Sequence, residues 1–204
     1  MEFLKMTAMG KADVLSDIDV RNVLNAVAQT RFPERNRIMF LLSIYAGLRV
    51  CNIQRIQIAD VYDSNGNPFD KIVLDHTKTK GNRVYECYLS DDLKTELKKY
   101  YKFLLSKHTT LKPTDYLIYS QKLSNNPLTK ESINRVFREV YDSVGLFQCR
   151  SHSGRRTFIT KLCDKGVAIQ LVSKLVNHTS VNTTLSYYQQ SPTLLKNAVN
   201  VLEL

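Results

Sequence analysis

Three short segments place charged or titratable side chains beside the ends of apolar stretches. In segment 46–49 (Ala-Gly-Leu-Arg), an arginine follows a glycine that ends an apolar helical pattern. Segment 152–157 is His-Ser-Gly-Arg-Arg-Thr, and segment 175–178 is Leu-Val-Asn-His. Tyr187 follows that last histidine by nine residues, and Tyr188 is next to it. Each segment alone is typical of a surface helix or of core packing, but together they supply the guanidinium, imidazole and phenol groups that suit a phosphate.

A helix that begins near His152 places this ring and Arg155 three residues apart on one face. Such a face joins one titratable group to one permanent cation, a combination that binds phosphate. The four histidines lack metal-binding spacing, and no two of the four cysteines form a C-x-x-C pair. Neither glycine-rich motif of the nucleotide-binding enzymes is present. We therefore expect no metal and no cofactor.

The charge balance indicates a polyanionic partner. The 204 residues include 29 Lys and Arg against 19 Asp and Glu, a formal charge of +10. Nucleic acid is the commonest such partner, and a solvated basic surface is the plainer interpretation. The candidates for contacts with a phosphate backbone are Lys71, Lys80, Arg83, Lys122, Lys130, Arg135, Arg138 and Arg156.

The sequence shows no targeting or membrane segment. No apolar run approaches the roughly 18 to 20 residues that span a bilayer. The N-terminus has no apolar stretch long enough for a signal peptide. We therefore expect a protein without a membrane segment, with free thiols in a reducing cytoplasm.

The elements that must position these residues are mostly helices. Apolar periodicity with start and stop residues predicts helices beginning near Asp17, Pro33, Cys51, Asp91, Thr129 and His152. Ser16 caps the first of them, and breaks are expected at Gly166 and near Thr179. Strands over 71–74 and 83–89 flank a tight turn. The expected fold class is therefore mainly α with a small antiparallel β-sheet (α+β), in one globular domain.

At these positions the sequence resembles the catalytic domain of the tyrosine recombinases, the phage-integrase type. That family combines an Arg in a Gly-Leu-Arg context, a Lys on a β-hairpin, His-x-x-Arg, a His or Trp, and a nucleophilic Tyr. The matching positions are Arg49, Lys78, His152, Arg155, His178 and Tyr187. The resemblance extends from about residue 14 to residue 190. It implies the family's catalytic-domain fold and a site-specific DNA recombinase or integrase that acts through a 3′-phosphotyrosyl intermediate, without metal or ATP.

The resemblance also implies a role for each position. The two arginines of the pattern hold the non-bridging oxygens of the scissile phosphate and offset the charge of a five-coordinate transition state. His178 adds a hydrogen bond, His152 accepts or donates a proton, and Lys78 protonates the departing 5′-oxygen. Tyr187 is the nucleophile, and its ordinary pKa of about 10 means that a base and cations must assist it.

The sequence departs from the family pattern at three positions. Asn52 occupies a position that is usually acidic, Arg156 replaces a usual His, and Asn177 replaces a usual Gly. None of these changes removes a proposed catalytic group. The nucleophile and the acid each have a neighbouring rival, because Tyr188 is adjacent to the expected tyrosine and Lys80 lies closer to the hairpin turn.

The expected organisation is an N-terminal extension over 1–15, a catalytic domain over 16–190 and a helical tail over 191–204. The tail packs on its own domain or docks on a neighbouring subunit. The implied partners are double-stranded DNA, other copies of the chain in a homotetramer on two recombination sites (with a free monomer), and accessory DNA-bending proteins. Most members of the family add an N-terminal DNA-clamping domain, so the sequence fits an excised catalytic domain or a short form such as the fimbrial phase-switch inverters.

Three other functions stay open. A type IB topoisomerase-like enzyme shares the nicking and closing chemistry but acts as a monomer on one duplex. A DNA-binding regulator with a decayed site needs no chemistry, and Asn52 leaves room for it. A basic helical module that binds RNA is a third alternative, although it gives no reason for the combination of arginines, histidines and tyrosine.

Overall fold

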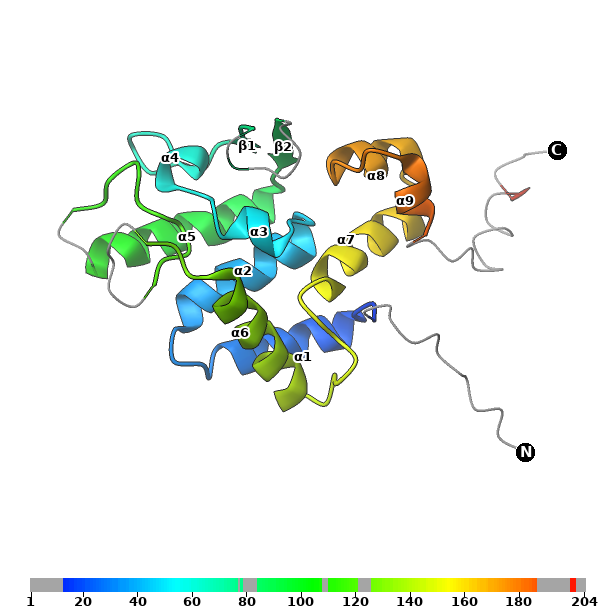
Figure 1. The fold of residues 1–204 in the computed structure, drawn as a ribbon, viewed down its shortest axis with the longest axis horizontal. Coiled ribbons are helices and arrows are strands. Elements are labelled where there is room, and N and C mark those ends of the chain that lie inside the picture. The colour runs from blue at the N-terminus through cyan, green and yellow to red at the C-terminus, as the bar shows by residue number, and fades with distance from the viewer. Residues whose placement is uncertain are drawn as a thin grey trace.

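The architecture is helical with one β-hairpin (Figure 1). The computed structural model describes residues 13–76, 78, 84–107, 110–120, 126–186 and 199–200. Its helices are α1 (Asp17–Val27), α2 (Pro33–Tyr45), α3 (Val50–Ile53), α4 (Ile58–Val61), α5 (Asp91–Lys107), α6 (Lys130–Ser143), α7 (Ser153–Asp164), α8 (Ile169–Leu175) and α9 (Val181–Leu185). The strands are β1 (Lys71–Leu74) and β2 (Tyr85–Tyr88). The predicted fold class is therefore confirmed.

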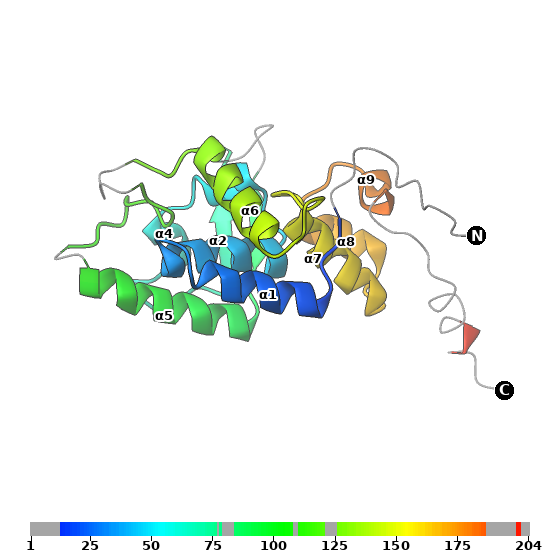
Figure 2. The same cartoon turned by 90° about the horizontal axis from the view of Figure 1, so that it is seen from below.

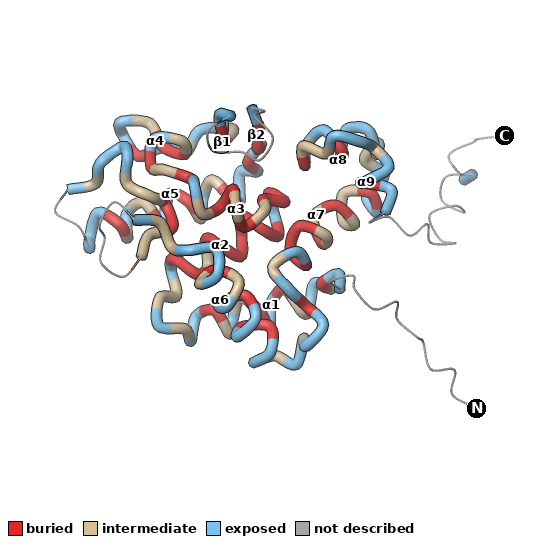
Figure 3. Tube along the Cα trace, viewed as in Figure 1, coloured by how far each residue is buried: buried red, intermediate tan, exposed pale blue. Residues whose placement is uncertain are grey.

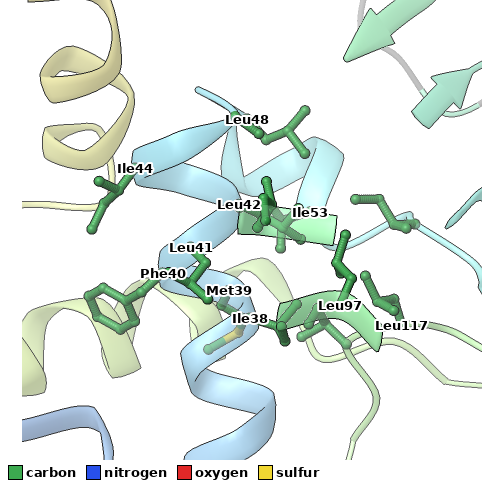
Figure 4. Close-up of a cluster of buried hydrophobic side chains, with 14 of the residues drawn as sticks. Ile38, Met39, Phe40, Leu41, Leu42, Ile44, Leu48, Ile53, Leu97 and Leu117 are labelled. Atoms are coloured by element: carbon green, nitrogen blue, oxygen red, sulfur yellow. The ribbon is translucent and has the colours of Figure 1, made fainter. Parts of the chain in front are cut away.

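The centre of the core is α2. Every residue from Ile38 to Ile44 is buried, and the helix packs against α1, α3, α5 and α7. Figure 4 shows its apolar side chains beside Ile53 of α3 and Leu97 of α5. Phe40 also packs against Phe137 of α6, with the rings tilted and their centroids 4.2 Å apart. A helix that is apolar on all sides has to be covered on all sides, which explains why the other helices surround it.

Side-chain caps set the starts of α1 and α6. Ser16 Oγ accepts from the backbone N–H of Asp19 at 3.1 Å, and Asp19 Oδ2 accepts from the backbone N–H of Ser16 at 2.9 Å. Thr129 Oγ1 accepts from the backbone N–H of Ser132 at 3.2 Å. Both caps satisfy donors that a helix leaves open in its first turn. The predicted starts of these two helices are confirmed.

The hairpin packs between two helices. β1 and β2 are antiparallel, with Ile72 opposite Cys87 and Leu74 opposite Tyr85. These four side chains are buried, while their neighbours along each strand face outward. β1 contacts α4 and β2 contacts α8. The hairpin therefore links the α3–α4 part of the chain to the α8 part (Figure 1).

The last three helices gather at one end of the molecule (Figures 1 and 2). Ile159 and Cys163 of α7 form a small apolar cluster with Val172 and Val176, and Figure 3 shows the buried inner sides of these helices. Gly154 lets α7 approach α2 closely, because a Cβ there would meet Ser43 Oγ. The predicted break at Gly166 is confirmed, and its φ of +79° is a conformation that favours glycine.

Three local predictions need correction. The short helix expected over about 51–56 is Val50–Ile53, and the separate helix Ile58–Val61 was not expected. The carboxylate of Asp60 stabilises the start of this helix, because its Oδ2 accepts from the backbone N–H of Gln57 at 2.8 Å. His152 is the residue before α7 and not part of it. Most of the tail over 191–204 and most of the extension over 1–15 lie outside the described residues. Among the described residues, no helix has the length and apolarity to cross a membrane.

Candidate active site

Arg155 ties together the three segments that carry the candidate residues. It lies on α7 and is only 1% exposed. Its Nη1 donates to the carbonyl of Gly47 at 2.5 Å, and its Nη2 donates to the carbonyl of Val176 at 2.5 Å. A buried cation is tolerable when acceptors surround it, and these two carbonyls come from far along the chain. One guanidinium thus fixes the loop before Arg49 and the turn before His178.

The loop before Arg49 depends on Gly47. This glycine has φ +62°, and a Cβ there would lie 2.6 Å from a ring carbon of Phe158. Its conformation ends α2 and brings Arg49 to the residue preceding α3. Arg49 is half-buried, and its side chain makes no hydrogen bond or ion pair with another described residue. The site therefore holds one guanidinium engaged by backbone carbonyls and one open to a ligand.

Arg49 and His152 line the same cavity, of about 670 Å³. Its other lining residues come from α3 and the turn after it, from α6 and from the segment before α7: Val50, Cys51, Arg55, Lys130, Asn134, Arg138, Arg150 and Ser151. Five of its lining residues are Lys or Arg and none is acidic, so the cavity suits a polyanion.

His152 is exposed at the edge of this cavity. Partial desolvation of its ring, followed by the charges of Arg155 and Arg49, lowers its pKa below the ordinary value. The imidazole is then neutral at pH 7 and able to accept a proton. The sequence predicted His152 and Arg155 on one face of a helix, but His152 precedes α7 and is exposed, whereas Arg155 is buried.

His178 occupies the turn after α8. Its Nδ1 lies 2.8 Å from Thr184 Oγ1 on α9, which fixes the orientation of the ring. Burial, followed by the charges of Arg155 and Arg49, lowers its pKa to about 4, so it is neutral at pH 7. Asn177 has φ 51°, the left-handed conformation that glycine adopts freely and that Asn tolerates among the other residues. This conformation explains why the family pattern usually has a glycine at that position.

The two predicted arginines of α6, Arg135 and Arg138, line different cavities. Arg138 lines the cavity of Arg49 together with Lys130 and Asn134, which stand at intervals of four residues along the helix. Arg135 lines a second cavity, also of about 670 Å³, with Arg31 of the α1–α2 turn. α6 therefore carries cationic side chains on both of its flanks.

Lys78 lies in a different setting from the other predicted catalytic residues. Its Nζ donates to both carboxylate oxygens of Asp60, at 2.7 and 2.6 Å, and to Gln57 Oε1 at 2.9 Å. It is not among the residues that line the cavity of Arg49. The structure thus places it against the start of α4.

Several predicted positions are not part of this geometry. Tyr187 and its rival Tyr188 lie outside the described residues, as do Lys80, Arg83 and Lys122. Arg156 is half-buried on α7 and does not line the cavity of Arg49. Lys71 forms an exposed ion pair with Glu86, with 2.5 Å between Nζ and Oε1. Among the described residues, no group of three or more His, Cys, Asp or Glu side chains is arranged to hold a metal ion.

The family model described as the phage integrase family matches residues 13–193. The chain belongs to this family. The match covers α1 to α9 and therefore every described residue of the candidate site.

Curated members of the family match most of the chain at modest identity. Tyrosine recombinase XerA of Pyrococcus furiosus is 26% identical over 193 residues, which cover 93% of this chain and 62% of that protein. The probable integrase/recombinase YoeC of Bacillus subtilis is 25% identical over 154 residues, 76% of this chain and 77% of that protein. This chain thus spans about three fifths of the length of XerA.

Solved structures of family members share the fold. The crystal structure of XerA recombinase has a TM-score of 0.74 and 21% identity, and covers 95% of this chain and 66% of that chain. The XerH site-specific recombinase in a post-cleavage complex with its difH substrate has a TM-score of 0.72 and 22% identity, covering 98% of this chain and 55% of that chain. The catalytic-domain fold of the family is therefore confirmed.

Sequence reasoning missed part of the cationic cavity. Arg55, Asn134 and Arg150 were not singled out, although all three line it. The spacing of Lys130, Asn134 and Arg138 was a usable signal, since residues four apart share a helix face. Arg150 carried no such signal, because its position depends on how the segment before α7 folds.

Proposed function

We propose that this chain is the catalytic domain of a site-specific DNA recombinase that cleaves and rejoins strands through a 3′-phosphotyrosyl intermediate. The observation that carries the proposal is the convergence of two guanidinium groups on two neutral histidines. Desolvation, followed by the charges of Arg155 and Arg49, lowers the pKa of both His152 and His178. A site with permanent cations and uncharged imidazoles can bind a phosphodiester and still offer a proton acceptor.

The cationic cavity supplies the substrate contacts in this proposal. Arg49 binds a non-bridging oxygen of the scissile phosphate, because its guanidinium is open to the cavity. Arg155 contributes its charge from its buried position. It also holds the two backbone segments that contain Arg49 and His178. Arg138, Lys130 and Arg135 contact neighbouring phosphates on the two flanks of α6. Double-stranded DNA is the proposed ligand, and Lys80, Arg83 and Arg156 are further proposed backbone contacts.

The cleavage step conserves the number of phosphodiester bonds. The phenol oxygen of Tyr187 attacks the phosphorus and loses its proton, for which neutral His152 is the proposed acceptor. The bond from phosphorus to the 5′-oxygen breaks, and that oxygen takes a proton from a lysine of the hairpin. His178 donates a hydrogen bond to a non-bridging oxygen. Attack by a second 5′-hydroxyl reverses the step, so no nucleotide is consumed.

A nicked suicide substrate tests the chemistry. When a short fragment beyond the cleavage site diffuses away, rejoining fails and the covalent adduct accumulates on a denaturing gel. We expect the adduct with the wild-type chain and with Tyr188→Phe, and none with Tyr187→Phe, which should still bind DNA. An adduct formed by Tyr187→Phe but lost in Tyr188→Phe would reassign the nucleophile.

Recombination also requires two sites and, in this proposal, four copies of the chain around two duplexes. Incubation with two marked duplexes and a supercoiled plasmid separates this function from its rivals. Exchange of the markers supports the recombinase. Relaxation of the plasmid without exchange favours a topoisomerase-like enzyme, and binding without any adduct favours a regulator.

A further inference from the structure

His178 is held at two points, one on its backbone and one on its ring. Its backbone N–H donates to the carbonyl of Ser173 on α8 at 3.0 Å. Its ring nitrogen Nδ1 lies 2.8 Å from Thr184 Oγ1 on α9. The two helices pack against each other (Figure 1). The imidazole therefore joins α8 to α9, and both helices define its orientation.

The hydroxyl group of Thr184 is shielded from water. This side chain is fully buried on α9. Among the described residues, its hydroxyl makes one hydrogen bond, to Nδ1 of His178. A buried O–H that finds no acceptor loses the hydrogen bond that it made with water in the unfolded chain. Within the described part of the chain, the acceptor for this O–H is therefore the lone pair of Nδ1.

This contact determines which ring nitrogen of His178 carries a proton. A neutral imidazole has one N–H and one lone pair. Burial, followed by the charges of Arg155 and Arg49, lowers the pKa of His178 to about 4, so the ring is neutral at pH 7. A proton on Nδ1 would leave the O–H of Thr184 buried without an acceptor among the described residues, which is disfavoured. With Nδ1 as the acceptor, the proton of the ring is on Nε2.

An N–H on Nε2 suits a ligand that carries negative oxygens. In the proposed function, His178 donates a hydrogen bond to a non-bridging oxygen of the phosphate. The other tautomer has a lone pair on Nε2, which repels an anionic oxygen. The family pattern has a His or a Trp at this position, and the indole N–H of Trp is a donor and never an acceptor. The two residues can replace each other in this hydrogen bond when the histidine presents an N–H.

We propose that Thr184 is a positioning residue whose hydroxyl donates a hydrogen bond to Nδ1 of His178 and thereby holds the ring in the Nε2–H tautomer that binds the phosphate. This inference rests on the proposed function, because the phosphate is the ligand that the tautomer serves. Thr184 precedes Tyr187 by three residues. The segment that carries the proposed nucleophile thus also carries the group that orients His178.

Nitrogen-15 NMR of the DNA-free chain at pH 7 tests the tautomer directly. In protein with labelled histidines, two-bond correlations between ring protons and nitrogens show which nitrogen carries the proton. The variant His178→Gln identifies the signals of this ring among those of the four histidines. We expect the Nε2–H form in the wild type and in Thr184→Ser, and a mixture of both tautomers in Thr184→Val. An Nδ1–H form in the wild type, or an unchanged Nε2–H form in Thr184→Val, would overturn the inference.

Two substitutions of Thr184 separate its hydroxyl from its packing. Thr184→Val keeps the branched shape and removes the hydroxyl, whereas Thr184→Ser keeps the hydroxyl and removes the methyl group. Because a hydrogen bond to a charged group changes a rate by roughly 10- to 100-fold, Thr184→Val should slow adduct formation by roughly tenfold. Thr184→Ser should keep most of the rate. Thr183→Val, at an exposed position of the same helix, is the matched control and should form the adduct like the wild type.

The opposite order, with a normal rate in Thr184→Val and a slow one in Thr184→Ser, would assign Thr184 to packing and overturn the inference. The His178→Gln variant shows whether Thr184 acts through the ring. Glutamine has no tautomers, so Thr184→Val should cause no further loss in that variant, and an equal loss in both backgrounds would contradict the proposal. If the wild-type chain forms no adduct, the proposed function fails, and the NMR measurement still decides the tautomer.

Discussion

The substitution Arg155→Lys tests how the site is held together. The guanidinium donates to the carbonyls of Gly47 and Val176, 108 and 21 residues away in the chain. Lysine keeps the charge but cannot reach two separated acceptors with a planar fork. One carbonyl is then left buried without a donor, which costs about 1–3 kcal/mol. We therefore expect a loss of about 2 kcal/mol in the free energy of unfolding.

Equilibrium urea unfolding of the DNA-free chain, followed by circular dichroism, measures this loss. The slope with urea is typically about 1–3 kcal/mol per molar, so the midpoint should fall by roughly 1 M with the slope unchanged. Arg138→Lys is the control, since this exposed side chain should change stability by less than about 0.5 kcal/mol.

Arg49→Lys separates holding the site from binding the phosphate. Because the side chain of Arg49 makes no hydrogen bond or ion pair with another described residue, its replacement should leave stability within about 0.5 kcal/mol and instead reduce formation of the covalent adduct. If Arg155→Lys unfolds at the wild-type midpoint, or if Arg49→Lys is the less stable variant, the assignment of these two guanidinium groups is wrong.

Three further predictions follow from single residues. At pH 5 the folded chain keeps His178 neutral while the unfolded chain protonates it, because the folded pKa is about 4. Stability should therefore fall by up to about 2 kcal/mol as pH drops from 7.5 to 5, and by less in His178→Gln, in thermal melts. The backbone at residue 177 is left-handed, with φ 51°. Asn177→Gly should therefore raise the melting temperature and Asn177→Ala should lower it, each by a change in stability of about 1 kcal/mol. Fluorescence anisotropy at several salt concentrations gives the slope of the logarithm of DNA affinity against the logarithm of salt. Arg138→Ala should reduce this slope by the amount that corresponds to about one phosphate contact, whereas Lys98→Ala on α5 should leave it unchanged.

The sequence was sufficient for the parts of the fold that depend on local chemistry. Ser16 and Thr129 cap the helices that they were expected to cap, and two short strand-like stretches around a tight turn predicted the hairpin. The caps depend on residues within four positions of one another, and the strands depend on residues that are adjacent in the chain. Both features can therefore be read from the order of the residues.

Parts of the site could not be predicted, because they depend on contacts between distant segments. The pattern His-x-x-Arg predicted one shared helix face, yet His152 lies before α7 and Arg155 turns inward to carbonyls of other segments. The acceptors of Lys78 come from α4, a helix of four residues that was not predicted, and from Gln57, the residue before it. Arg150 was overlooked for the same reason. By contrast, the left-handed backbone at residue 177 could have been predicted, because Asn tolerates that conformation and stands at the position of a usual glycine.

The central claim is that Tyr187 becomes joined to the 3′ side of a cleaved DNA strand, and mapping the trapped adduct tests it most directly. The adduct is digested with nuclease and protease, and mass spectrometry locates the nucleotide on a peptide, while kinase labelling reports on the other DNA end. We predict a nucleotide bound through its 3′-phosphate to Tyr187 and a released strand with a free 5′-hydroxyl. A 5′-phosphate linkage, attachment to another residue, or no adduct from the wild-type chain would contradict the account.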